Sequence, residues 1–202
     1  KSLTLVATDG HRLALAQATL EAEIPKQEVI LPRKTVLELQ RLLKDEDAPI
    51  EMRFAPNQAK FSFGGMEFVS KLVEGKFPDY NRVIPKNHKN RVTLGRSPLL
   101  QSLQRAAILT SDKFKGVRVN LEPGMLRIAS SNAEQEEAME ELEIDYGGDA
   151  IEIGFNVTYL IDALANMGQE MVTVELQDTN SSALITVPDQ SGFKYVVMPM
   201  RI

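Results

Sequence analysis

A weak internal repeat constrains the fold of this 202-residue chain more than any other feature of its sequence. The segment "LTLVATD" at Leu3 aligns with "LRIASSN" at Leu126, and "FVSKLV" at Phe68 aligns with "YVVMPM" at Tyr195. The two offsets, 123 and 127 residues, are nearly equal, which is typical of one structural unit used twice. Two similar α+β domains of about 100 residues each are therefore predicted.

The first half of the chain predicts a hairpin, a helix and short strands. Residues 3–16 alternate apolar and polar side chains around Asp9-Gly10, a strong signal for a two-residue turn. A helical period follows, with Pro32 suited to the first turn and Pro49 just beyond the end. The apolar face of this helix comprises Val36, Leu39, Leu42 and Leu43. Alternating strands come next, and their turns are expected at Pro56-Asn57 and Gly64-Gly65.

The second half uses similar elements with a helix and a strand added at its start. One helix is expected to begin at Ser97-Pro98. Another begins at Asn156, a favourable N-cap residue, and stops at Gly168. Strand patterns occur in "GVRVNL", "GMLRIASSN", "EAMEELEIDY", "AIEIGF", "MVTVELQD", "SALITV" and "FKYVVMPMRI".

The stretch between the halves, "PDYNRVIPKNHKNR", has no apolar periodicity and is predicted to link the domains. We expect one domain at residues 1–83, a linker at residues 84–91 and a second domain at residues 92–202. The first copy of the repeat lacks the helix and strand that precede "LRIASSN" in the second. The first domain is therefore expected to be incomplete on its N-terminal side.

Charge is distributed unevenly along the chain, although the formal net charge is −5. Residues 85–118 carry eight basic side chains and one acidic, whereas residues 134–145 carry seven acidic and none basic. These runs are either two solvated faces or one phosphate-binding surface opposite an acidic one. The chain has no cysteine, which excludes disulfides and thiolate sites. It also lacks a long apolar run or a signal pattern, so we expect a cytoplasmic protein without a membrane partner.

Histidine paired with aspartate is the pattern that most suggests catalysis, at Asp9 and His11 or at Asp79 and His88. A single glycine separates Asp9 from His11, and the chemistry of a tight turn explains that spacing without catalysis. The sequence has no Walker loop, nucleophile elbow, zinc motif or dinucleotide fingerprint. No catalytic residue, metal ion or cofactor is therefore expected.

Several segments share their order and residues with one known family: "TDGHRLA", "KLVEGKFPDYNRVIPK", "RAAILTSDKFKGVR", "EQEE", "GFNVTYL" and "YVVMPMRI". Together they resemble the bacterial DNA polymerase III beta subunit family, the sliding clamps. The resemblance implies an α+β DNA-clamp fold, in which repeated domains place antiparallel sheets outside and helices on the DNA-facing side. It covers most of the middle domain and the whole last domain of a three-domain protomer.

The same resemblance implies a non-enzymatic processivity factor of the replicative polymerase. Full-length members close as homodimeric rings around duplex DNA, without sequence preference, whereas this chain alone is expected to be monomeric. The implied protein partners are the DNA polymerase III alpha subunit, the clamp loader delta subunit, other DNA polymerases and repair proteins.

In this family, partners dock a short linear peptide in a hydrophobic cleft between the middle and last domains. The matching positions are Thr8, Gly10, His11, Arg12, Leu13, Pro78, Arg82, Val83, Phe114, Asn156, Tyr159, Ser182, Val196, Val197, Met198, Pro199, Met200, Arg201 and Ile202. Flexible methionine thioethers suit a cleft that accepts different sequences. Asn180 stands where the family has an apolar residue and is left out of the site. Without the resemblance, "VVMPM" would suggest an ordinary edge strand.

The DNA-facing candidates that the resemblance implies are Arg33, Lys34 and Arg105, with Arg96 and Lys115 as further candidates. Each could equally be a solvated surface charge. Two other functions remain open on the sequence. One is a small DNA-modifying enzyme that uses His11 and Asp9, and the other is a sequence-nonspecific DNA-binding module without a peptide site.

Overall fold

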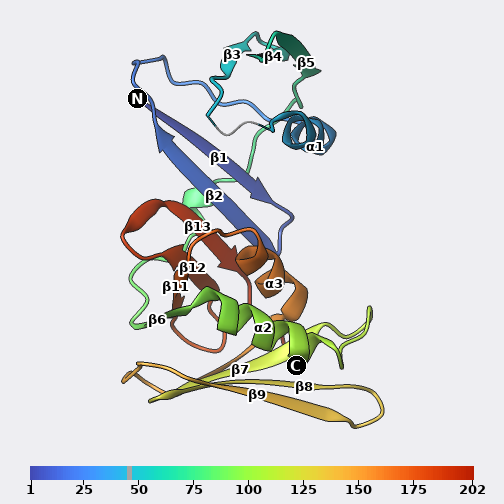
Figure 1. The fold of residues 1–202 in the computed structure, drawn as a ribbon, viewed down its shortest axis with the longest axis vertical. Helices are drawn as coiled ribbons and strands as arrows, with labels where there is room; N and C mark the ends of the chain where they lie inside the picture. The colour runs from blue at the N-terminus through green and yellow to red at the C-terminus, as the bar shows by residue number, and fades with distance from the viewer. Residues whose placement is uncertain (45–46) are drawn as a thin grey trace. The chain divides into compact units, whose positions relative to one another are not determined.

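The computed structural model describes residues 1–44 and 47–202, which form two compact units (Figure 1). The first unit comprises Lys1–Ala22 and Tyr80–Ile202, and the second comprises Glu23–Asp79. The start of the chain therefore packs with the second half of the sequence. The domain limits proposed at residues 83 and 92 remain a prediction.

The predicted hairpin forms the edge of the larger sheet of the first unit. Strands β1 (Ser2–Thr8) and β2 (Arg12–Thr19) pair antiparallel across the Asp9-Gly10 turn. On its other side β2 pairs with β13 (Gln190–Val197), the last strand of the chain. The complete order is β1-β2-β13-β12-β11-β6, with β12 (Ala183–Val187), β11 (Met171–Leu176) and β6 (Asn90–Gly95).

A second sheet and two helices complete this unit. The sheet has the order β10-β7-β8-β9, with β7 (Gly116–Glu122), β8 (Met125–Ser131), β9 (Glu137–Glu143) and β10 (Ile151–Asn156). Helices α2 (Arg96–Ala107) and α3 (Val157–Ala165) lie side by side (Figure 1). Because α2 packs on β8 and β9 while α3 contacts β10 and β13, the helices are held against both sheets.

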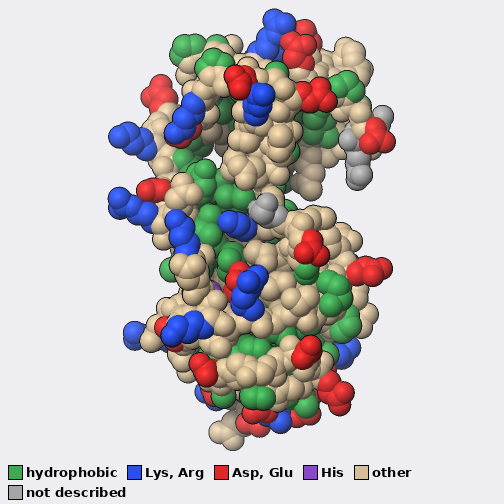
Figure 2. All heavy atoms as spheres, turned by 90° about the vertical axis from the view of Figure 1, so that its left-hand side faces the viewer, with side chains coloured by type: hydrophobic (Ala, Val, Ile, Leu, Met, Phe, Trp, Pro, Cys, Tyr) green, Lys and Arg blue, Asp and Glu red, His purple; other side chains and the backbone are tan. Residues whose placement is uncertain are grey.

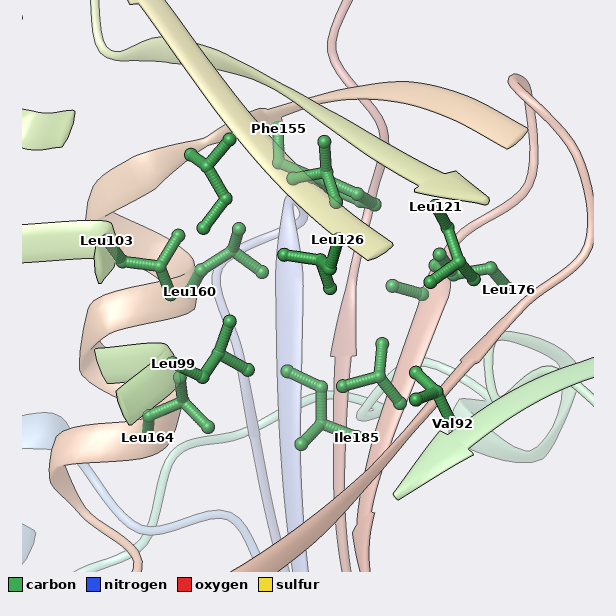
Figure 3. Close-up of a pocket in the computed structure, with 14 residues that line it drawn as sticks. Val92, Leu99, Leu103, Leu121, Leu126, Phe155, Leu160, Leu164, Leu176 and Ile185 are labelled. Carbon is green, nitrogen blue, oxygen red and sulfur yellow. The ribbon is translucent and has the colours of Figure 1, made fainter. Parts of the chain in front are cut away.

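The core of the first unit lies where these helices meet the sheets. Apolar side chains alternate along β7 and β8, so one face of each of these two strands is buried. Figure 3 shows leucines of both helices, among them Leu103 and Leu164, pointing toward side chains of the sheets, among them Phe155 and Ile185. They surround a small cavity of about 40 Å³ lined only by apolar residues.

The ends of the helices show which capping predictions hold. The Asn156 side chain accepts a hydrogen bond from the main-chain nitrogen of Thr158 at 2.9 Å, which confirms the predicted cap of α3. The prediction that α2 begins at Ser97-Pro98 is wrong by one or two residues. Its N-cap is Gly95, because the nitrogen of Arg96 donates to the carbonyl oxygen of Glu170 and anchors the chain directly after β6.

The second unit has one helix and one small sheet. Helix α1 (Arg33–Leu42) precedes a three-stranded meander of β3 (Glu51–Phe54), β4 (Gln58–Phe63) and β5 (Met66–Lys71). The Thr35 hydroxyl of α1 shares a buried 2.6 Å hydrogen bond with Ser70 of β5. Val36 and Leu43 remain exposed, so within this unit the predicted apolar face of α1 is only partly covered. In the part of the chain that the structure describes, no helix is long and apolar enough to cross a membrane.

Candidate functional site

The hairpin turn and the carboxyl-terminal tail meet in the first unit, although they are far apart in sequence. The tail is the segment of residues 198–202 that follows β13. The ladder between β2 and β13 pairs Leu13 with Val196 and Arg12 with Val197. Beyond the ladder, the main-chain nitrogen of Met198 donates to the carbonyl oxygen of His11 at 3.0 Å. The backbone thus brings together two of the segments that the sequence assigned to one site.

The turn has a rigid backbone of its own. Gly10 has a φ of +89°, which side chains other than that of glycine rarely adopt. The Asp9 carboxylate accepts hydrogen bonds from the main-chain nitrogens of His11 and Arg12, at 2.9 and 3.1 Å. The Thr8 hydroxyl donates to the carbonyl oxygen of Arg12 at 2.7 Å. These bonds fix His11 and Arg12 at the end of the hairpin.

After Met198 the tail crosses the second sheet over two glycines. The nitrogen of Met200 donates to the carbonyl oxygen of Gly154 on β10 at 2.7 Å. A Cβ added at Gly154 would lie 2.8 Å from the Ile202 side chain, and one at Gly116 on β7 would lie 3.1 Å from it. Glycine at these two positions therefore lets the tail lie directly on the strands.

Helix α3 contributes an aromatic ring and a carboxylate to the same place. The Arg12 guanidinium lies 4.3 Å from the ring centroid of Tyr159, and the His11 ring is roughly parallel to that ring at 6.4 Å. One Arg12 nitrogen donates to Asp162 at 2.6 Å, and another donates to Asp9 at 3.1 Å. The guanidinium is thus held by two carboxylates and faces an aromatic ring.

These contacts shift the ionisation of the groups involved. Burial raises the pKa of Asp9, but the hydrogen bonds from His11 and Arg12 outweigh it and place this pKa below its usual value of 3.8. Burial lowers the pKa of Arg12, but its hydrogen bonds to Asp162 and Asp9 raise the pKa by more. The net shift is upward, so Arg12 stays charged. Burial and the nearby charge of Asp162 raise the pKa of Tyr195 on β13.

The apolar residues of the predicted site divide into buried and exposed ones. Leu13 and Val196 are buried in a small cluster with Leu15, Ile84 and Leu184, so they support the surface from below. The exposed apolar members are Val83, Phe114, Met198, Met200 and Ile202. We call the patch formed by His11, Arg12, Tyr159, Met198 and Met200 the hairpin–tail surface.

The structure places the other predicted site residues on several elements of both units. Ser182 accepts a bond from His88 through its carbonyl oxygen and directly precedes Ala183, which pairs with Val197. Arg82 ends the short helix η1 (Tyr80–Arg82), two residues before the buried Ile84. Phe114 closes a tight turn with Ser111. Pro199 and Arg201 belong to the tail. Pro78 lies in the second unit, whose placement relative to the first is not determined.

Three residues that contact this surface or the tail were not predicted. Gly116 and Gly154 had a detectable signal, because a lone glycine in a strand pattern indicates close approach of another backbone. Asp162 had none, because its partner Arg12 lies 150 residues away in the sequence.

The predicted DNA-facing residues differ in whether other groups of the protein already bind their charged side chains. Arg33 and Lys34 are exposed in the first turn of α1, which contains no acidic residue. Arg105 forms a two-pronged pair with Glu140, and Lys115 lies 3.5 Å from Asp112. The guanidinium of Arg96 donates to the carbonyl oxygen of Leu164 in the last turn of α3 and to that of Gln169, four residues beyond the helix.

The basic run at residues 85–118 is partly neutralised by acidic neighbours. Arg91 pairs with Glu175 at 2.9 Å, and Arg118 lies 3.9 Å from Glu152. On the face drawn in Figure 2, Lys and Arg side chains are interspersed with Asp and Glu. Acidic side chains of neighbouring strands therefore take up part of the charge of this run.

The geometry gives little support to a catalytic reading of His11 and Asp9. The Asp9 carboxylate bonds to main-chain nitrogens and to Arg12, while the His11 ring lies against Tyr159. Among residues 1–44 and 47–202, no group of three His, Cys, Asp or Glu side chains could hold a metal ion.

Comparison with family models covers nearly the whole chain. Residues 1–79 match the model of the DNA polymerase III beta subunit, central domain, and residues 81–201 match that of its C-terminal domain. The beta sliding clamps of Pseudomonas aeruginosa and Escherichia coli K12 are 46% and 44% identical to this chain over its full length. The chain spans 55% of the length of each of these relatives.

Solved structures show the same likeness in three dimensions. The crystal structure of a DNA polymerase sliding clamp from Pseudomonas aeruginosa with ligand matches all of this chain with a TM-score of 0.93 at 46% identity, over 55% of its own length. A beta sliding clamp from Caulobacter crescentus also matches all of it, with a TM-score of 0.93 at 37% identity, over 54% of its own length.

Proposed function

This chain belongs to the DNA polymerase III beta subunit family, and on that premise we propose that it is part of a sliding clamp, a non-catalytic processivity factor. In the complete protein a ring around duplex DNA would tether the replicative polymerase without reading its sequence. Such a protein acts on the chromosome, so its expected place in a bacterium is the cytoplasm.

We further propose that the hairpin–tail surface binds the short linear peptides of the protein's partners. The observation that carries this proposal is the hydrogen bond from Met198 to His11, which joins both predicted segments into one surface. Exposed thioethers of Met198 and Met200 offer adaptable apolar contacts, and Arg12 and His11 offer polar ones beside them. The proposed partners are the DNA polymerase III alpha subunit, the clamp loader delta subunit, other DNA polymerases and repair proteins.

The test is titration of a labelled Gln-Leu-x-Leu-Phe-type peptide by fluorescence polarisation, with a scrambled peptide as control. We expect saturable micromolar binding of the first peptide and none of the second. Deletion of Met198–Ile202 should abolish binding, because each apolar side chain covered by the peptide contributes about 1.5–3 kcal/mol. The deleted residues are mostly exposed, so circular dichroism should show a folded protein. Unchanged affinity after the deletion would contradict the proposed site.

DNA contact is proposed through the first turn of α1. Arg33 and Lys34 lie at the positive end of a helix dipole with no carboxylate nearby in that turn, which is unfavourable for the isolated helix. Phosphate groups would offset this repulsion.

A nuclease assay on the wild type and on His11→Ala separates this function from the enzymatic alternative. A clamp should cleave no DNA in either form, whereas an enzyme that uses His11 should lose its cleavage activity in the variant.

A further inference from the structure

Asp162 lies one helical turn after Tyr159 on α3, and its ion pair with Arg12 is one of the contacts between the hairpin turn and that helix. Its carboxylate accepts a 2.6 Å bond from Arg12, whose guanidinium lies 4.3 Å from the Tyr159 centroid. Asp9 holds the guanidinium on another of its nitrogens at 3.1 Å. Arg12 is therefore fixed in direction by two carboxylates and one ring.

The fold itself does not depend on this ion pair. The backbone of Arg12 is already held by its ladder partner Val197, and the next residue, Leu13, is buried. The Arg12 and Asp162 side chains keep 35% and 49% of their surface exposed. Ion pairs this accessible contribute little to stability because water competes for both charges. What Asp162 determines is the direction of a long side chain, not the path of the main chain.

We propose that Asp162 is a positioning residue of the hairpin–tail surface, which holds the Arg12 guanidinium against Tyr159 ready for a bound peptide. This inference rests on the proposed function. Of the five N–H groups of Arg12, the bonds to Asp162 and Asp9 use two, which leaves donors for peptide carbonyl oxygens. A side chain that is already ordered loses less conformational entropy when the peptide binds.

The experiment is a double-mutant cycle on peptide affinity, with Asp162→Ala, Arg12→Ala and the double variant. We expect Asp162→Ala to weaken binding about five- to tenfold, and Arg12→Ala to weaken it at least as much. In the Arg12→Ala background, Asp162→Ala should change affinity by less than about twofold. The melting temperature of Asp162→Ala should stay close to that of the wild type. If Asp162 only stabilised the fold, the melting temperature would fall together with the affinity.

Two further variants sharpen the test. Asp162→Glu restores a carboxylate and should recover most of the lost affinity. Glu175→Ala removes the ion pair between Glu175 of β11 and Arg91 of β6, and it should leave affinity unchanged because β11 is two strands away from β13.

The outcomes separate this inference from the proposed function. A wild-type protein that fails to bind the peptide would overturn the proposed function, and the positioning role with it. If the wild type binds the peptide and Asp162→Ala binds it equally well, only the positioning role is overturned. Equal losses from Asp162→Ala with and without Arg12 would also overturn it, since Asp162 would then act by another route.

Discussion

The main-chain nitrogen of Met200 donates a hydrogen bond to the carbonyl oxygen of Gly154, at 2.7 Å, where the tail crosses β10. A Cβ at Gly154 would come closer to the carbonyl oxygen of Met200 than van der Waals contact allows. The same Cβ would press on the Ile202 side chain at 2.8 Å. The position of the tail and of its exposed methionines thus depends on glycine at residue 154, which has no side chain to displace them.

Gly154→Ala should therefore displace the tail. Overpacking of this kind costs about 1–3 kcal/mol, and we expect peptide affinity to fall about tenfold or more. Gly168→Ala is the matched control, because a Cβ there meets nothing within 4 Å. Fluorescence polarisation of both variants checks the prediction, and wild-type affinity in Gly154→Ala would contradict it.

Acid should weaken the hairpin turn through Asp9. The pKa of Asp9 is lower in the folded protein than in the unfolded chain, so its contribution to stability is present above about pH 4 and is lost as the pH falls through the folded value. Asp9→Asn should then lose less unfolding free energy between pH 5 and pH 2 than the wild type does. Urea denaturation at both pH values measures this, and equal losses in the two proteins would refute it.

Leu164→Ala should destabilise the first unit strongly. Leu164 is fully buried and lines the apolar cavity of Figure 3, so its truncation enlarges an existing void. The expected loss is about 2–5 kcal/mol of unfolding free energy. Leu5→Ala, at a residue of the same unit that is 59% exposed, should change it by about 0.5 kcal/mol or less. Chemical denaturation followed by circular dichroism tests the pair, and similar losses would contradict the described core.

Charge reversal of Arg33 and Lys34 should weaken binding to duplex DNA and leave peptide affinity unchanged. If each contacts one phosphate, the slope of log affinity against log salt should decrease by about 0.9 per residue. Arg105→Glu is the comparison variant, and it should have a smaller effect because Glu140 already engages that charge. Binding to a labelled duplex at several salt concentrations measures the slopes. An unchanged slope for the Arg33 and Lys34 variant would argue against contact at this helix end.

Local features of the sequence were enough to predict most elements. The hairpin at residues 3–16 and the N-cap at Asn156 are confirmed, because a tight turn and a cap depend on residues within one turn of each other. The start of α2 was missed by one or two residues, because its first nitrogen bonds to Glu170, which is distant in sequence.

The sequence by itself determined the alternation of the strands, the presence of α1, α2 and α3, the N-cap of α3 and, through shared motifs, the family. The resemblance also assigned the hairpin and the tail to one site, but only the tertiary structure shows which contacts join them. The pairing of β2 with β13, the seat of the tail on Gly154 and the pair of Arg12 with Asp162 each join residues separated by at least 40 positions. Side-chain chemistry sets local backbone preference, but such contacts exist only after sheets and helices have packed and excluded water, and no local pattern encodes their partners.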